Sequence, residues 1–165
     1  MSAATAGGGA QALLEIRGLT VALPPDANRV NAVEDIYLSL SRNEGLCMVG
    51  ESGSGKSVTA HVVMELLPEP HVRIASGDIV FEGQIITKLN PASWRDLQGR
   101  RMGMIFQEPM SALNPVMRIG DQVGEVLRAH TTMSAAERKR CVVELLDAVG
   151  LPEPQTLYEV YPFRL

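Results

Sequence analysis

Residues 50–57 read Gly50-Glu51-Ser52-Gly53-Ser54-Gly55-Lys56-Ser57, and this stretch decides the fold. Its pattern, G-x-x-x-x-G-K-S, is typical of a phosphate-binding loop, or P-loop. The glycines let the backbone curl so that several N–H groups point at the β- and γ-phosphates of a nucleotide. Lys56 adds a positive charge for the same oxygens, and Ser57 offers a hydroxyl to Mg²⁺. A helix that begins at Lys56 would add the positive end of its dipole.

The residues on both sides of the loop fit this interpretation. Before it, residues 45–49 form a short apolar run, which predicts a buried strand. After it, apolar residues recur at helical spacing until Pro68. They are Val58, Val62, Val63, Leu66 and Leu67. A strand, a glycine-rich loop and a helix in this order are the setting that the motif needs, whereas a flexible Gly/Ser loop with a chance lysine would lack it.

The remaining segments predict a mixture of strands and helices. The predicted strands are 13–17 and 19–23, joined at Gly18, then 30–40, 77–83, its hairpin partner 84–89, and a second buried strand at 102–107. Asn90-Pro91 predicts the start of a helix over 92–98, and 110–117 reads as a loop. Two helices finish the chain, one from about Ile119, the other opening with a capping box at 134–137 and ending at Gly150.

Composition excludes several functional classes. The chain has 165 residues, 45% hydrophobic and 21% charged, which is typical of a globular protein. Its net charge of −4 gives no support to a nucleic-acid-binding surface. Cys47, within the predicted buried strand, and Cys141 lie far apart, and no histidine has metal-ligand spacing with them. We therefore expect no metal site within the protein itself, and Mg²⁺ would arrive with the nucleotide.

The N-terminal segment 1–11 is rich in Ala and Gly and is predicted to be a disordered tail, since it has neither the basic nor the apolar region of a signal peptide. No apolar segment approaches the length that a bilayer span requires. Any membrane role is therefore expected to come through a partner.

Two motifs occur in the order of one known family. The first is 49–60, the P-loop with Val58-Thr59-Ala60 after it, and the second is 104–115, Met104-Ile105-Phe106-Gln107-Glu108-Pro109-Met110-Ser111-Ala112-Leu113-Asn114-Pro115. With these motifs, the sequence from Leu13 to Leu165 resembles the ATP-binding subunits of ABC transporters, in the dipeptide and oligopeptide importer branch. The resemblance implies an α/β fold: a P-loop NTPase core with an N-terminal antiparallel β-subdomain and a partial α-helical subdomain, truncated. It implies an incomplete ATP-binding domain over 12–165, with the β-subdomain and core in 12–107 and the helical part in 108–165.

The resemblance also implies roles for single residues. Residues 50–58 would hold MgATP. Gln107 would complete the Mg²⁺ coordination, sense the γ-phosphate and couple the site to the helical subdomain. Leu23 stands where the family has an aromatic residue that stacks on adenine, and it would offer a plain apolar contact instead. Asn43 replaces a usual glycine, which is tolerable because Asn can adopt a left-handed turn conformation.

For function, the resemblance implies an ATP-binding, energy-coupling subunit of an importer for peptides or related solutes. Such a subunit is peripheral, on the cytoplasmic face of the cell membrane, and pairs with membrane-spanning permease subunits and a second ATP-binding subunit. In the family, the signature helix, the Walker B strand with its catalytic glutamate and the switch histidine lie beyond the position of Leu165. We therefore expect these residues to bind MgATP but to need those elements for hydrolysis, and to be poorly stable because central strands lack neighbours.

Two other readings stay open. One is a non-catalytic nucleotide-binding module, which the missing catalytic elements favour for the chain as given. The other is a different soluble P-loop enzyme such as a nucleoside kinase, against which stand the β-rich segment before the P-loop and the match around Gln107. A structural protein with an accidental loop is a further possibility.

Overall fold

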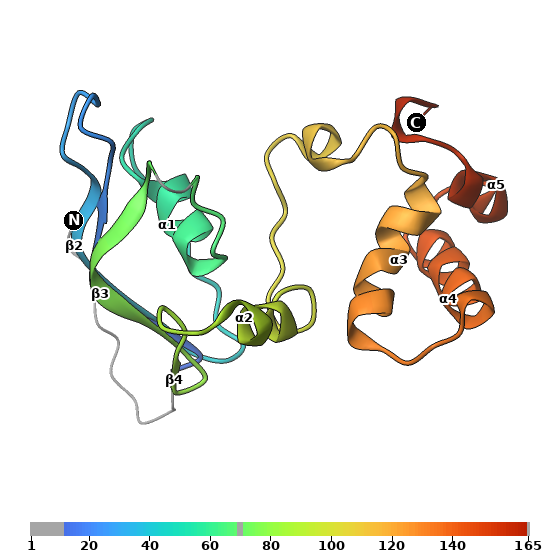
Figure 1. The fold of residues 1–165 in the computed structure, drawn as a ribbon, viewed down its shortest axis with the longest axis horizontal. Helices are drawn as coiled ribbons and strands as arrows, with labels where there is room; N and C mark the ends of the chain where they lie inside the picture. The colour runs from blue at the N-terminus through green and yellow to red at the C-terminus, as the bar shows by residue number, and fades with distance from the viewer. Residues whose placement is uncertain (1–11, 69–70, 165) are drawn as a thin grey trace. The chain divides into compact units, whose positions relative to one another are not determined.

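The computed structural model describes residues 12–68 and 71–164. The chain forms two compact units, Met1–Trp94 (unit 1) and Arg95–Leu165 (unit 2), each with its own buried residues (Figure 1). The predicted tail 1–11 lies outside the described residues. No helix in the described ranges is both long and apolar enough to cross a membrane.

Unit 1 contains a four-stranded antiparallel sheet with the order β2-β1-β3-β4. Its strands are β1 (Leu14–Ala22), β2 (Asn31–Leu40), β3 (Arg73–Phe81) and β4 (Gln84–Ile85). The predicted N-terminal antiparallel subdomain is therefore confirmed. The hairpin after Phe81 is also confirmed, although its second strand is much shorter than predicted, and β3 begins four residues before the predicted 77–83.

The two short strands predicted on either side of Gly18 are a single strand, so the prediction of a break was wrong. Gly18 has a φ of +59°, and the pairing of β1 with both neighbours shifts register around it. The glycine thus makes a bulge within β1, because pairing resumes on both sides of the irregularity. At the end of β2, Asn43 has a φ of +60°, which confirms its predicted left-handed conformation.

Among the described residues, one helix belongs wholly to unit 1. Helix α1 (Lys56–Val63) follows the P-loop, as predicted, but ends before the last apolar residues of its sequence pattern. Its buried residues are Thr59 and Val62. The largest fully buried side chains of unit 1 come from the strands and the β4 region: Ile16, Leu19, Val21, Ile79 and Ile86. The core therefore lies against the sheet, where these apolar side chains leave water together.

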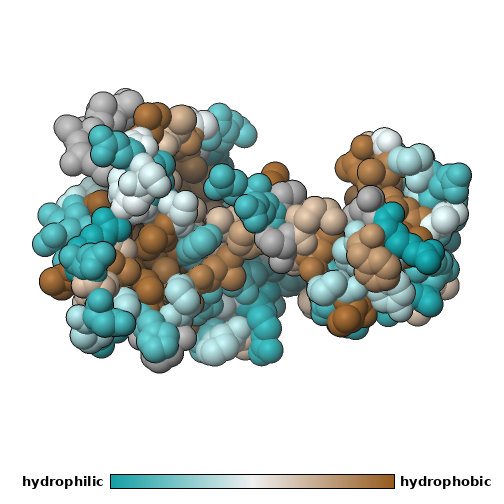
Figure 2. Space-filling view, turned by 90° about the horizontal axis from the view of Figure 1, so that it is seen from above, coloured by the Kyte–Doolittle hydropathy of each residue, from teal (hydrophilic) through white to brown (hydrophobic). Residues whose placement is uncertain are grey.

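Two predicted buried strands are absent from the structure. Residues 45–49 and 103–106 are irregular, and Met102 makes only an isolated bridge with Gln98. Val49 is 80% exposed and Ile105 is 95% exposed, and Cys47, expected in a buried strand, is also exposed. The reason is pairing: a strand needs a neighbour for its backbone groups, and the one sheet in the described ranges provides none for either run. Figure 2 shows apolar side chains, in brown, on the surface.

Helix α2 (Pro91–Leu97) crosses the boundary between the units, and its start is capped as predicted, since the Ser93 N–H donates to the Asn90 side chain at 3.0 Å. Beyond it, α3 (Ile119–His130), α4 (Ala135–Ala148) and α5 (Pro154–Glu159) pack against one another. Their core consists of Ile119, Val142 and Leu146, with partly buried apolar neighbours. The predicted helical subdomain is therefore confirmed.

The start of α4 follows the sequence prediction in detail. The Glu137 N–H donates to the Ser134 hydroxyl, and the Ser134 N–H donates to the Glu137 carboxylate at 2.8 Å, which completes the capping box. The Ser134 hydroxyl also donates to the Glu137 carboxylate at 2.7 Å, and this hydrogen bond, followed by the one from the Ser134 N–H, lowers the pKa of Glu137. In the loop predicted over 110–117, a short 3₁₀ helix occupies Pro109–Ala112 and the rest is irregular.

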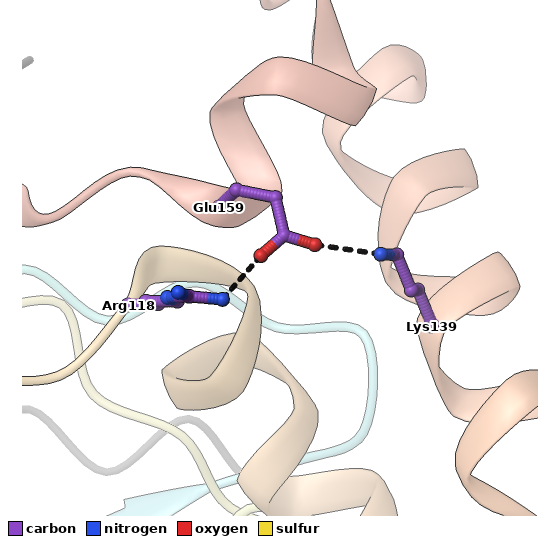
Figure 3. Close-up of polar contacts among 3 residues, drawn as sticks. All are labelled: Arg118, Lys139 and Glu159. Atoms are coloured by element: carbon purple, nitrogen blue, oxygen red, sulfur yellow. Dashed lines mark hydrogen bonds and ion pairs between the residues drawn. The ribbon is translucent and has the colours of Figure 1, made fainter.

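Glu159, at the end of α5, connects three parts of unit 2 (Figure 3). It accepts from Lys139 of α4 at 2.6 Å and from Arg118, which precedes α3, at 2.5 Å. The Lys139 ammonium also lies 4.8 Å from the centre of the Tyr158 ring. The hydrogen bond from Lys139 is the main cause that lowers the pKa of Glu159. The three helices are thus joined by charge as well as by their apolar core.

Candidate phosphate-binding site

The P-loop is closed around the ammonium group of Lys56. Its Nζ donates to the Gly50 carbonyl at 2.7 Å, to the Glu51 carbonyl at 2.7 Å and to the Ser54 hydroxyl at 3.2 Å. The loop is also closed by the Ser54 N–H, which donates to the Glu51 carbonyl at 3.3 Å. The curl predicted from the glycines is therefore present, and a positive charge lies inside it.

Gly55 is the residue where the loop becomes a helix. It caps α1 with a φ of +94° and provides no side-chain hydrogen bond to the first turn. A Cβ at this position would lie 2.3 Å from the Val33 Cγ1 and 2.8 Å from the Ala32 carbonyl oxygen. Glycine is thus required here twice, for its left-handed backbone and for the close approach to β2.

The first turn of α1 is suited to an anion. The N-terminal N–H groups of a helix lack intrahelical partners and carry the positive end of the dipole. The N-cap residue of α1, Gly55, has no side chain that could cap them. Ser57 is exposed in this turn and Val58 is half-buried. The start of α1 therefore offers N–H donors and the Ser57 hydroxyl next to the Lys56 ammonium, and the binding of MgATP by residues 50–58 stays a prediction.

The fit of Mg²⁺ follows from the donor set. Ser57 offers one hydroxyl oxygen, which is a hard ligand of the kind that Mg²⁺ prefers. The described residues contain no group of three His, Cys, Asp or Glu side chains that could hold a metal ion. Within the P-loop, the Ser57 hydroxyl is thus the side-chain group that fits as a ligand for a magnesium ion.

Two residues of the strands form the wall behind the loop, and sequence reasoning missed them. They are Ala32 and Val33, the second and third residues of β2. Thr59 was missed as well: its hydroxyl and its N–H both donate to the Gly55 carbonyl, at 3.0 Å and 2.9 Å. A threonine four residues after the last loop glycine is a recognisable signal for such bonding. No sequence pattern marks Ala32 and Val33 in this way, because contact between a strand and a loop distant in sequence depends on the tertiary fold.

Leu23 lies at the end of the sheet where the loop does. It is half-buried, directly after β1, and its N–H donates to the Val30 carbonyl at 2.9 Å. Ala22 pairs with Asn31 next to it, one residue before the wall formed by Ala32 and Val33. Leu23 therefore lies close to the start of β2, and its contact with adenine stays a prediction.

Gln107 is different, because it belongs to unit 2. It is exposed, on the irregular segment that precedes the 3₁₀ helix Pro109–Ala112. Its predicted contact with the nucleotide site stays a prediction.

Comparison with known proteins agrees with these features. The family model described as "ABC transporter" matches residues 33–161. The oligopeptide transport ATP-binding protein OppD of Bacillus subtilis is 39% identical over 150 residues, covering 91% of this chain and 42% of that protein. The dipeptide transport ATP-binding protein DppD of the same organism is 36% identical over 152 residues, covering 92% and 45%.

The fold is also similar to a solved structure. A dimeric ATP-binding cassette in a post-hydrolysis state, bound to ADP and phosphate, superimposes with a TM-score of 0.73 at 21% identity, covering 92% of this chain and 62% of that one. The chain spans somewhat less than half the length of the two curated relatives. A match of the family model over most of the chain, with both motifs in place, shows that this protein belongs to the ABC transporter family.

Proposed function

We propose that this chain carries the nucleotide-binding P-loop of an ATP-binding, energy-coupling subunit of an importer for peptides or related solutes. The observation that carries the proposal is the Lys56 ammonium inside the curled loop at the start of α1. Phosphate oxygens can replace the loop carbonyls as partners of the lysine, while the N–H groups of the helix start bind the remaining oxygens. The peptide substrate class is supported by the names of the two relatives.

The test of this proposal is the replacement of Lys56. We expect Lys56→Ala to abolish binding of a labelled ATP analogue in the presence of magnesium, because it removes the charge at the phosphates and three hydrogen bonds within the loop. Lys88→Ala is the matched control, since Lys88 is an exposed lysine of unit 1 whose ion pair is with Asp78. Retained binding in Lys56→Ala would reject the site.

For the metal ion we propose that Ser57 completes the shell of a Mg²⁺ that arrives with ATP. A hydroxyl can ligate a hard cation. We expect Ser57→Ala to lower the magnesium dependence of ATP binding while binding of the metal-free nucleotide is retained. An unchanged magnesium dependence would remove Ser57 from the shell.

We further propose that residues 12–165 represent an incomplete ABC-type ATP-binding domain, which acts at the cytoplasmic face of the membrane with permease subunits and a second ATP-binding subunit. The dimeric neighbour supports the second subunit, and the peptide-transport relatives support a permease partner. The chain should bind ATP without releasing phosphate until an intact homologue is added. Phosphate release from the purified chain alone, abolished by Lys56→Ala, would contradict this.

A further inference from the structure

We propose that Gln122, in the first turn of α3, is a positioning residue that fixes residues 114–117 on the helical core of unit 2. It thereby fixes the point where the segment that carries Gln107 joins that core. The contacts that carry the inference lie within unit 2, and only its meaning for energy coupling rests on the proposed function.

The side chain of Gln122 makes three hydrogen bonds with backbone groups that precede it in the sequence. Its Oε1 accepts from the Asn114 N–H at 2.8 Å. Its Nε2 donates to the Asn114 carbonyl at 2.9 Å and to the Met117 carbonyl at 2.8 Å. This set needs two N–H donors and one acceptor on the same group, which a side-chain amide has and a carboxylate or an ammonium does not. The chemistry of the contact therefore selects glutamine.

Residues 114–117 are also bonded to one another. The Asn114 side chain accepts from the Val116 N–H at 3.1 Å, and its carbonyl accepts from the Met117 N–H at 3.2 Å. Val116 is 81% exposed, so apolar packing does little to hold its side chain. An irregular segment has no ladder partners for its backbone groups, and here Gln122 supplies them. Holding Asn114 and Met117 thus holds the whole turn.

The first turn of α3 is itself fixed to the rest of the helical core, where α3 lies beside α4 and α5 (Figure 1). Ile119 is 7% exposed and belongs to this core, and its N–H donates to the Val160 carbonyl at 2.9 Å. A Cβ at Gly120 would lie 2.2 Å from the Tyr158 ring, so the ring packs directly on the helix backbone. Because a close-packed turn cannot shift without disturbing its neighbours, the residues that Gln122 holds share its position.

The segment that carries Gln107 ends at this turn. Gln107 lies seven residues before Asn114, and seven residues span at most about 25 Å when fully extended. The 3₁₀ helix Pro109–Ala112 shortens this span further. Gln107 is therefore joined to the helical core by a short tether whose far end Gln122 holds. In an energy-coupling subunit, a displacement of the core would reach this segment through that end.

The first experiment measures amide hydrogen exchange by NMR on the whole 165-residue chain. Gln122→Met keeps the side-chain length and the helix propensity but removes the three hydrogen bonds. We expect the Asn114 amide to exchange more than about tenfold faster, and the Val142 and Leu146 amides of α4 to keep their rates. Asn114→Ala is the matched control: it removes the bond from Val116 but keeps the backbone groups that Gln122 binds, so the amide at position 114 should stay protected.

The second experiment measures position instead of protection. Spin labels are placed on Val116→Cys and on Glu144→Cys, an exposed position of α4, in a background whose two native cysteines are replaced. The distribution of distances between the labels should be about twofold broader in Gln122→Met than in the chain with Gln122. Gln155→Met, at an exposed glutamine of α5, is the control and should leave the distribution unchanged.

Three results would overturn the inference: an unchanged exchange rate at Asn114 in Gln122→Met, an unchanged distance distribution, or a loss of protection at Val142 and Leu146. In the last case Gln122 would hold the whole helical core and not one segment. Lys56→Ala should change neither measurement, because Lys56 belongs to unit 1. Retained ATP binding in Lys56→Ala would reject the nucleotide site and leave the position of Gln122 standing, so the two failures are distinguishable.

Discussion

The P-loop and the five residues before it differ in how they are formed. The loop is held by contacts within six residues, from Lys56 to Gly50, Glu51 and Ser54. Residues 45–49 have the composition of a buried strand, yet they are irregular and exposed. The loop can form alone because its hydrogen-bond partners lie within the same few residues. A central strand instead needs neighbouring strands, and the described sheet does not supply them for residues 45–49.

Replacing Gly55 should break the loop and has the largest expected effect. In Gly55→Ala the new Cβ meets Val33 and the Ala32 backbone, and the backbone must keep a φ of +94°. We expect a loss of about 3 kcal/mol in the free energy of unfolding, measured with denaturant, and the loss of nucleotide binding.

Gly53→Ala is the matched control, because Gly53 also has a positive φ, +77°, but its Cβ would meet nothing within 4 Å. Gly53→Ala should lower the free energy of unfolding by about 1 kcal/mol. Equal losses in the two variants would mean that the contact with β2 is not what requires glycine at position 55.

In unit 2, by contrast, Glu159 forms its ion pairs with residues 20 and 41 positions away in the sequence. Distance in sequence is thus no obstacle when both partners belong to the same unit. Glu159→Gln removes both ion pairs and should lower the thermal midpoint of unit 2 slightly at neutral pH. Glu144→Gln, at an exposed position of α4, is the control and should have no effect.

The difference in thermal midpoint between the wild type and Glu159→Gln should depend on pH in one direction. The folded-state pKa of Glu159 is lowered from its ordinary 4.5, so its stabilisation is present above that value and is lost as the pH falls through the lowered pKa. The thermal midpoints of the wild type and of Glu159→Gln should therefore become equal in acid. A difference that grows on acidification would contradict the ion pairs.

The smallest effect is expected in the segment before the loop. Val49 is 80% exposed, so Val49→Asp should change the free energy of unfolding by less than about 0.5 kcal/mol and should reduce aggregation. Val33→Asp, at a buried position of β2, is the contrast and should cost about 3 kcal/mol.

A loss above about 1 kcal/mol in Val49→Asp would mean that residues 45–49 are buried as a strand after all. A sharp two-state melt at an ordinary domain temperature would likewise contradict the expected poor stability of the chain.

Much of the fold could be predicted because its signals are local. The capping box at Ser134 and Glu137, the Asn90 cap and the hairpin after Phe81 each involve residues a few positions apart. The loop geometry over 50–58 is local for the same reason, whereas its role as the nucleotide site stays a prediction. The bulge at Gly18 was missed, since a glycine in a strand pattern is equally consistent with a break or with continued pairing.

The sequence by itself determined the P-loop, the helix starts and the family, because glycines, a lysine and capping side chains act on backbone groups within their own turn. Only the tertiary structure decided that Ala32 and Val33 lie behind Gly55, that Leu23 joins Val30 at the same end of the sheet, and that residues 45–49 stay outside it. The physical reason is that a strand forms only when another strand accepts its hydrogen bonds, and no short pattern records which neighbour will be present.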